Sequence, residues 1–370
     1  MGNKTNLRKC LIIVAALLFG TNGHAKADFI FGMPTNLGPA VNSSALDAGP
    51  SISADGLTLI FFSNRSGGYG GYDLWVTKRT SISDPWGKAV NLGAIINSSA
   101  HESHASISTD GLSLYFGEGT YFSVSPRPGG LGQSDIWVAS RATIFEHWGT
   151  PGNLGPTVNS SANEGGPSLS GDGLILIFDS DRPGGSGRHD LWMTTRPTVS
   201  DPWDQPVNLG PTVNSSALDA VPGISADGLV LFFMSNRTGG ARGDYCIWVT
   251  TRPSVSDTFG TPVILGTPVN SSAIEATQCI SADGSTLFFM SERSGGVGGF
   301  DIWQVPIEPV VDLNGDGIVD SADMCIMVDH WFTDEPLCDI GPTPFGDGIV
   351  DVQDLIVLAE HFFEEFPPVE

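Results

Sequence analysis

Oxygen-bearing side chains recur at short, regular spacing near the C-terminus, from Asp312 to Asp323. This segment has the sequence D-L-N-G-D-G-I-V-D-S-A-D. Oxygen side chains fall at loop positions 1, 3, 5, 9 and 12, and Gly317 falls at position 6, where a calcium-binding loop turns sharply. The pattern therefore predicts a Ca²⁺ site. Its predicted ligands are Asp312, Asn314, Asp316, Ile318 (through its carbonyl oxygen), Asp320 and Asp323.

A second, altered copy of this loop follows, with the sequence F-G-D-G-I-V-D-V-Q-D. Its aspartates fit positions 5, 9 and 12, but phenylalanine and threonine occupy positions 3 and 1. Asp339 can supply the first ligand if the intervening I-G-P-T-P-F-G bulges outward. We therefore expect weaker binding here. The predicted ligands are Asp339, Asp347, Ile349 (through its carbonyl oxygen), Asp351 and Asp354.

The N-terminus has the pattern of an export signal. Basic residues precede an apolar run from Leu11 to Phe19, and Ala25-Lys26-Ala27 places small residues around a cleavage point. We expect residues 1–27 to be removed and the protein to be secreted, either extracellular or attached to a cell surface. The apolar run is too short to span a bilayer.

The chain is strongly acidic, with a formal net charge of −24. Cleavage of the export signal removes four basic residues and no acids, which moves the charge to about −28. Such a surface repels nucleic acid and anionic lipid, so both are excluded as partners.

Each calcium-type loop is followed by an apolar segment that predicts one helix. The first, Met324–Phe332, places Met324, Met327, Val328 and Trp331 on one stripe. Two such half EF-hands in an exported chain resemble a type I dockerin. This resemblance implies a cohesin-like partner on a scaffold or cell surface, often beside polysaccharide-degrading machinery. The family's Ser/Thr recognition pair is replaced by Ser321-Ala322 and Val352-Gln353.

Four cysteines follow the export signal. Secretion permits disulfides, and four cysteines allow three connectivities. Cys325 with Cys338 is the favoured pair because both lie in the tail, and Cys246 with Cys279 is a weaker prediction.

The body of the chain is one unit written five times. Asp-Gly turns recur at spacings of 55, 62, 55 and 56 residues, each opening a β-rich run. A Gly-rich turn, a strand ending in tryptophan, N-L-G and N-S-S-A follow. Four short strands per unit are typical of a propeller blade. The repeat tryptophans are Trp75, Trp137, Trp192, Trp248 and Trp303.

The D-G turns and the R-x-G-G…D-[LI]-W motif resemble the WD-like repeats of TolB-type propellers. We therefore predict an all-β, five-bladed β-propeller over residues 28–306. A linker at 307–311 and a small α-helical, dockerin-like EF-hand domain at 312–366 follow. The repeats begin with P-T-N-L-G at Pro34–Gly38, which corresponds to a fourth strand without its own first three. We therefore expect this segment to complete the last blade as its outer strand and to remove two open sheet edges.

Two loops of every repeat carry opposite charges. An acid follows each repeat asparagine by five residues, and an arginine lies in the S-x-R-x-G-G loop that should share its face. A catalytic interpretation would use two of these acids, including Glu102. A structural interpretation is favoured, because a pair present in every blade is the expected bidentate clamp.

The second repeat departs from the others. Its loop from Phe116 to Gly130 is about seven residues longer and adds Glu118, Tyr121 and Phe122 on the face that carries His101 and His104. Aromatic rings beside carboxyl and imidazole groups suit a carbohydrate ligand. A surface insertion without function is the alternative. The two histidines could also bind a metal, although a third ligand is missing.

The sequence thus predicts a secreted binding module for a glycan or a protein. A glycoside hydrolase or lyase acting on polysaccharide is the alternative. An enzyme would need acids that break the repeat and point into one cleft. Glu118 satisfies this condition best, with Glu102 a weaker catalytic candidate.

Overall fold

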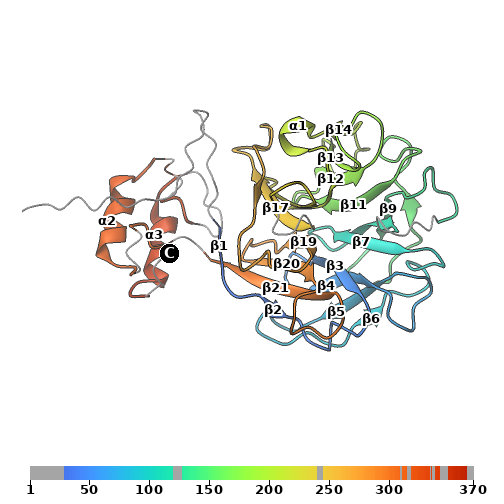
Figure 1. Ribbon diagram of the computed structural model, residues 1–370, viewed down its shortest axis with the longest axis horizontal. Helices are drawn as coiled ribbons and strands as arrows, with labels where there is room; N and C mark the ends of the chain where they lie inside the picture. Colours follow the sequence, from blue (N-terminus) through green and yellow to red (C-terminus); the bar gives the residue numbers. More distant parts are fainter. Residues whose placement is uncertain are drawn as a thin grey trace, which may run out of the picture.

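A computed structural model describes most of the 370-residue chain. The described residues are 29–119, 127–239, 245–308, 311–314, 318–333, 335, 338–341 and 349–364. Five antiparallel sheets are arranged in a ring, and two helices lie beside the ring near the C-terminus (Figure 1). The predicted five-bladed, mostly-β fold is confirmed.

Each blade has four main strands, in chain order from the inside outward. Blade one contains β3 (Asp47–Ile52), β4 (Thr58–Ser63), β5 (Asp73–Lys78) and β6 (Val90–Asn91), and blade two contains β7 (Glu102–Ile107), β8 (Ser113–Glu118), β9 (Trp137–Ser140) and β10 (Gly152–Asn153). Blade three contains β11 (Glu164–Leu169), β12 (Ile175–Ser180), β13 (Asp190–Thr195) and β14 (Val207–Asn208), followed by α1 (Gly210–Val213). Blade four contains β15 (Asp219–Ile224), β16 (Val230–Ser235), β17 (Cys246–Thr251) and β18 (Val263–Ile264).

The fifth blade is completed by the start of the described chain. β19 (Glu275–Ile280), β20 (Thr286–Ser291) and β21 (Asp301–Glu308) supply its inner three strands. β2 (Thr35–Asn36) pairs with β21 as the outer strand, with Asn36 opposite Trp303. β1 (Ile30–Phe31) pairs farther along β21. The predicted closure is confirmed, and β21 runs to Glu308, two residues past the predicted boundary.

The asparagine of each N-S-S-A motif hydrogen-bonds the connecting loop to the third strand of its blade. Asn97 accepts a hydrogen bond from the Leu74 N–H at 2.8 Å and donates to the Leu74 carbonyl at 3.0 Å. Asn42 makes the same two bonds to Ile302 across the closure. These buried bonds satisfy backbone groups that the short outer strands leave unpaired.

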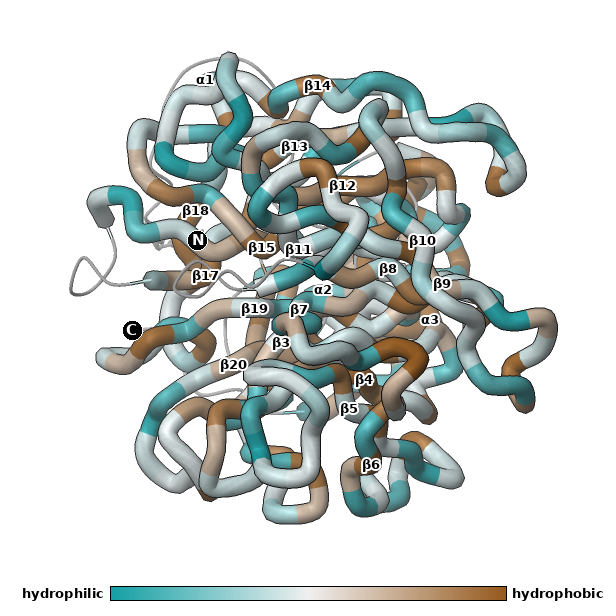
Figure 2. Tube along the Cα trace, turned by 90° about the vertical axis from the view of Figure 1, so that its right-hand side faces the viewer, coloured by the Kyte–Doolittle hydropathy of each residue, from teal (hydrophilic) through white to brown (hydrophobic). Residues whose placement is uncertain are grey.

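The inner strands gather around the propeller axis, and short outer strands such as β6 and β14 lie at the rim (Figure 2). Phenylalanines and branched aliphatic residues from neighbouring blades fill the space between sheets. The largest fully buried rings are Phe61, Phe116, Phe178, Phe232, Phe233, Phe288 and Phe289.

The tail consists of two matched halves. α2 (Ser321–Asp329) and α3 (Val352–Glu360) each begin at an aspartate that caps the helix. The segment after each helix pairs with the loop of the other half, because Phe332 N donates to the Val350 carbonyl and Phe363 N to the Val319 carbonyl. A small core of its own results, which includes Met327 and Leu358.

Two predictions for the tail need correction. Met324 and Val328 are exposed, so they do not share the buried stripe with Met327. The helices pack through the face that carries Met327 and its neighbour Ile326 instead. Among the described residues, Cys246, Cys279, Cys325 and Cys338 form no disulfide, and Cys325 is exposed on α2 while Cys338 is buried in the core of the tail.

Within the described ranges, no helix is long and apolar enough to cross a membrane.

The closure predicts a specific effect of truncation. A protein that starts at Asp47 lacks β1 and β2 and leaves β21 as an open edge, so its melting temperature should fall by more than about 5 °C. A protein that ends at Glu308 keeps all five blades and should retain the melting transition of the propeller. Differential scanning calorimetry compares them. An unchanged transition in the protein that starts at Asp47 would contradict the stabilising role of β2.

Candidate functional site

The repeated arginines and acids form one ion pair in every blade. Arg182, for example, lies 3.0 Å from Glu164, and its guanidinium also stacks over Trp192 at 5.2 Å. All five carboxylates are buried. The favoured structural interpretation agrees with this geometry, and it applies to Glu102, which is held by Ser98 and Arg127. The pairs are Arg65–Asp47, Arg127–Glu102, Arg182–Glu164, Arg237–Asp219 and Arg293–Glu275.

Glu118 breaks this pattern. It occupies the last position of β8, where the other blades have Ser63, Ser180, Ser235 and Ser291. Ser180 donates to the loop carboxylate of its blade at 2.9 Å, but Glu118 accepts from the Arg127 N–H at 2.8 Å instead. Its Oε2 is buried and has no hydrogen-bond partner among the described residues. Such an oxygen calls for water or a ligand group.

Asp179 is a second acid that breaks the repeat. It precedes the serine of β12, where other blades have Phe62, Gly117, Met234 and Met290. Its Oδ1 lies 3.1 Å from Nδ1 of His189, and its Oδ2 accepts from the Val221 N–H at 3.1 Å.

Glycines make room for this carboxylate. A side chain at Gly166, which has a φ of +56°, would place its Cβ 2.6 Å from Asp179 Oδ2. His104 occupies the corresponding bulge of β7 with a φ of +45°, a backbone conformation that costs about 1–3 kcal/mol for a non-glycine residue. The bulge turns the His104 side chain inward.

These groups line one small polar cavity between blades two and three. It has a volume of about 70 Å³ and is lined by His104, Glu118, Asn163, Asp179 and His189 together with glycines. His104 also lines the central channel, whose cavity is about 40 Å³. The polar cavity therefore opens beside the propeller axis and has room for about two waters or one polar group of a larger ligand.

Burial and pairing shift the pKa values of these groups in different directions. Burial raises the pKa of Glu118 to about 7 and lowers the pKa of His104 to about 4. Burial alone would lower the pKa of His189, but the hydrogen bond to Asp179 together with the charges of Asp179 and Asp181 outweighs burial and raises the pKa. Near neutral pH, the cavity therefore holds a partly protonated carboxyl, a neutral imidazole and an Asp179–His189 pair. Such a division suits acid–base chemistry or binding of hydroxyl groups.

The structure places only some of the predicted ligand residues together. His104 and Glu118 meet in the polar cavity. His101 does not line it; its ring packs on Tyr72 at 5.0 Å, and burial lowers its pKa. Tyr121 and Phe122 lie outside the described residues.

Asp179 and His189 were missed by the sequence analysis. A signal was present, because D in L-I-L-I-F-D-S and H in R-H-D-L-W replace apolar or aromatic residues of most other repeats.

In the tail, the last aspartate of each loop closes it. Asp323 accepts from the N–H groups of Asn314 and Asp320 at 3.0 and 2.8 Å. Asp354 accepts from the N–H groups of Gly341 and Asp351 at 2.7 and 2.6 Å.

Asn314 lies two residues after Asp312, and Gly341 lies two residues after Asp339, so the two loops are closed at equivalent positions. In this register, Asp339 corresponds to Asp312 at position 1. No three His, Cys, Asp or Glu side chains within the described part of the chain are grouped as a metal site requires. Asp316 and Asp347 lie outside that part. Asp312, Ile318 and Ile349 lie within it, on the two loops.

Comparisons with known proteins concern the fold alone. No protein-family model matches the chain, and no curated protein matches it significantly. TolB from Acinetobacter baumannii is 13% identical with a TM-score of 0.43, and the match covers 72% of this chain but only 56% of TolB. An arabinanase from Bacillus subtilis is 14% identical with a TM-score of 0.48, covering 71% of this chain and 95% of the arabinanase. The five-bladed assignment rests on the strand pairing described above.

Glu118 should make stability depend on pH. Folding raises its pKa from 4.5 to about 7, so between these values the unfolded chain has lost a proton that the folded protein retains. Stability from this group is therefore lost as the pH rises through that window. From pH 5 to pH 8, Glu118→Gln should gain up to about 2 kcal/mol relative to the wild type, allowing for partial solvent access.

Urea unfolding at both pH values measures this difference. Glu146→Gln, at an exposed acid of the same blade, serves as the control and should show no such change. A Glu118→Gln difference that is equal at pH 5 and pH 8 would mean that the carboxyl is not protonated by burial.

Proposed function

We propose that this chain is a secreted propeller that binds a glycan at the polar cavity and is tethered by a calcium-dependent tail. The observation that carries the proposal is the meeting of Glu118 and Asp179, two acids from different blades that break the repeat, in one cavity. The arginines and acids that recur in every blade form ion pairs that stabilise the fold. Glu118 and Asp179 do not belong to this repeated set, so stability of the fold alone does not account for them.

The chemistry of the cavity favours hydroxyl groups. A hydroxyl both donates and accepts hydrogen bonds. Protonated Glu118 can donate through Oε2 and Asn163 Oδ1 can accept, and both atoms are buried without partners among the described residues. The cavity volume admits one hydroxyl or hydroxymethyl group and leaves the sugar ring outside. A carbohydrate that inserts such a group is the ligand we favour over a protein.

A glycoside hydrolase or lyase is the second candidate, supported by the same two acids. In hydrolysis, protonated Glu118 would give its proton to the leaving glycosidic oxygen as the C–O bond breaks. Water would add to the anomeric carbon and lose a proton to Asp179. Binding is favoured because a cavity of about 70 Å³ is too small to enclose two sugar rings around the bond to be cleaved.

Variants that restore the repeat separate the two functions. Glu118→Ser and Asp179→Met copy the residues of other blades and should therefore leave the fold intact. For a binding module, wild type is retained on immobilised polysaccharides without releasing reducing ends, and both variants lose retention by about tenfold or more. Val207→Ser, at an exposed site of blade three, serves as the control.

A panel of plant and algal polysaccharides provides the ligands. Release of reducing ends by the wild type that disappears in Glu118→Ser would establish the enzyme instead. Retention unchanged in both variants would place any glycan site elsewhere on the protein.

The tail supports the tethering part of the proposal. Its two halves exchange backbone bonds as paired loops do, and each loop brings carboxylate and amide oxygens, the donor set that Ca²⁺ prefers. Asp312, Asn314, Asp316 and Asp320, with the Ile318 carbonyl and Asp323, would hold one ion. Asp339, Asp347, Asp351 and Asp354, with the Ile349 carbonyl, would hold a second, weaker one. A cohesin-like or other surface protein would be the partner of the loaded tail.

Calcium binding is tested on the whole secreted chain. The first loop should bind with a Kd of about 10⁻⁷ to 10⁻⁵ M, measured by titration calorimetry, and Asp312→Ala should remove that phase. Asp329→Ala, an exposed aspartate at the end of α2, is the matched control and should bind as the wild type does. Absence of a calcium-dependent heat, or a response unaffected by Asp312→Ala, would refute the calcium assignment and the dockerin resemblance with it.

A further inference from the structure

A large cleft lies between blades one and two, away from the polar cavity. It has a volume of about 530 Å³, within the range of ligand sites. Its floor comes from β4, β5 and β7 and its far wall from the loop at 141–148. The apolar residues that line it include Ile60, Val76, Ile95, Ile107, Ile144 and Trp148. We call this cleft the blade 1–2 groove.

One wall of the groove departs from the repeat. The loop of blade two has the sequence R-A-T-I-F-E-H-W, where blades one and three have R-T-S-I-S-D-P-W and R-P-T-V-S-D-P-W. Phe145 therefore replaces Ser83 and Ser200, and its side chain is 92% exposed. A phenyl ring held in solvent at the edge of a cleft stabilises nothing within the fold, but it offers a flat face for stacking.

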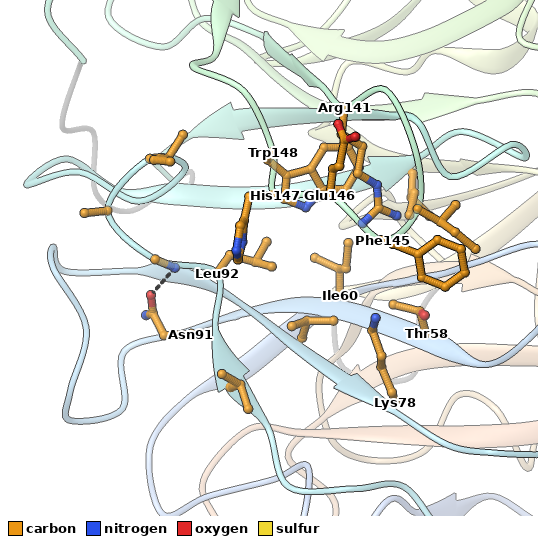
Figure 3. Close-up of a pocket in the computed structure, with 17 residues that line it drawn as sticks. Thr58, Ile60, Lys78, Asn91, Leu92, Arg141, Phe145, Glu146, His147 and Trp148 are labelled. Atoms are coloured by element: carbon orange, nitrogen blue, oxygen red, sulfur yellow. Dashed lines mark hydrogen bonds between the residues drawn. The ribbon is translucent and has the colours of Figure 1, made fainter.

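The opposite wall departs from the repeat as well. Lys78 and Lys88 are the only lysines that follow the export signal. Lys78 ends β5 and lines the groove, and Gly87 N donates to its carbonyl at 2.8 Å. The pairing of β5 with β6 ends at Val76↔Val90, and Gly87 bonds to Lys78 beyond it, so Lys88 follows the residue that bonds to Lys78 at this end of the sheet. In Figure 3, Lys78 extends toward the groove, across from the loop that carries Phe145 and His147.

This lysine pair is unfavourable by itself. Like charges on neighbouring chain segments repel each other, and the corresponding residues of blade three, Thr195 and Gln205, are neutral. The neighbouring acids are Asp55, which lies within electrostatic range of Lys78, and Glu146, which lines the groove. On a chain of net charge −24, two neighbouring lysines make this one of the places where an anion meets less repulsion.

We propose that the blade 1–2 groove binds a uronate-containing polysaccharide, with one sugar face on Phe145 and a sugar carboxylate at Lys78 and Lys88. A uronate carries one charge per sugar and keeps hydroxyls for Glu146 and His147. A densely sulfated chain would meet stronger repulsion from the acidic surface. This site is separate from the polar cavity and deepens the proposed glycan binding by naming a substrate class.

The test compares polygalacturonate with its fully methyl-esterified form, which keeps the sugar and removes the charge. Affinity electrophoresis of the mature full-length protein is run in EDTA, so that calcium neither crosslinks the polymer nor loads the tail. Wild type should bind the acid form about tenfold more tightly than the ester, which corresponds to about 1.4 kcal/mol. The difference should shrink at high salt.

Variants test the role of each wall of the groove in binding. Lys78→Gln with Lys88→Gln should remove the preference for the acid form, and Phe145→Ser, which restores the repeat residue, should weaken binding of both forms by about threefold or more. Thr195→Ala with Gln205→Ala, at the equivalent sites of blade three, is the control and should bind as the wild type does.

Three outcomes would overturn the proposal. They are equal binding of the acid and the ester, unchanged binding by the lysine variant, and equally tight binding of poly-glutamate, which would indicate an acidic protein partner. Glu118→Ser is included throughout. If Glu118→Ser loses binding while the lysine and Phe145 variants have no effect, the glycan binds at the polar cavity alone. This inference would then have failed while the proposed function holds.

Discussion

Closure of the ring is the constraint on which the other features depend. Five sheets can surround an axis without open edges only if the first strands of the chain complete the last blade, as β2 does against β21. The buried bonds of Asn42 to Ile302 across this junction match those that hold the continuous blades. The same geometry keeps the inner strands close together, so cavities at the axis are small.

Within this frame, repetition and departure have different physical meanings. Each Arg–carboxylate pair is buried and stacked on aromatic rings, so a lone change at such a pair would leave an unpaired buried charge. Departures survive where they create a new, locally satisfied arrangement. Asp179 with His189 is one, and its carboxylate fits only because Gly166 has no side chain.

The two unusual regions of the propeller differ in their electrostatics. Glu118 and His104 are buried at the polar cavity, so burial shifts the pKa of each and favours the neutral forms. At the blade 1–2 groove, Lys78 lies instead on the exposed end of β5, where it can attract an anion through solvent. In our proposals one region recognises a hydroxyl group and the other an anion, and both lie on a ring whose repeated arginines and acids are paired with each other.

The sequence alone determined the number of blades, the closure and the arginine–acid frame, because each depends on a pattern repeated five times at nearly constant spacing. It also indicated the paired loops of the tail and the unusual position of Glu118. Only the tertiary structure brought Asp179 and His189 to Glu118, and Lys78 to a groove with Phe145. These meetings depend on which faces of neighbouring blades are adjacent. The same reason explains the exposed Met324 and Val328 and the separated Cys325 and Cys338: helical spacing places residues on a helix, but packing against the other half selects the face that is buried.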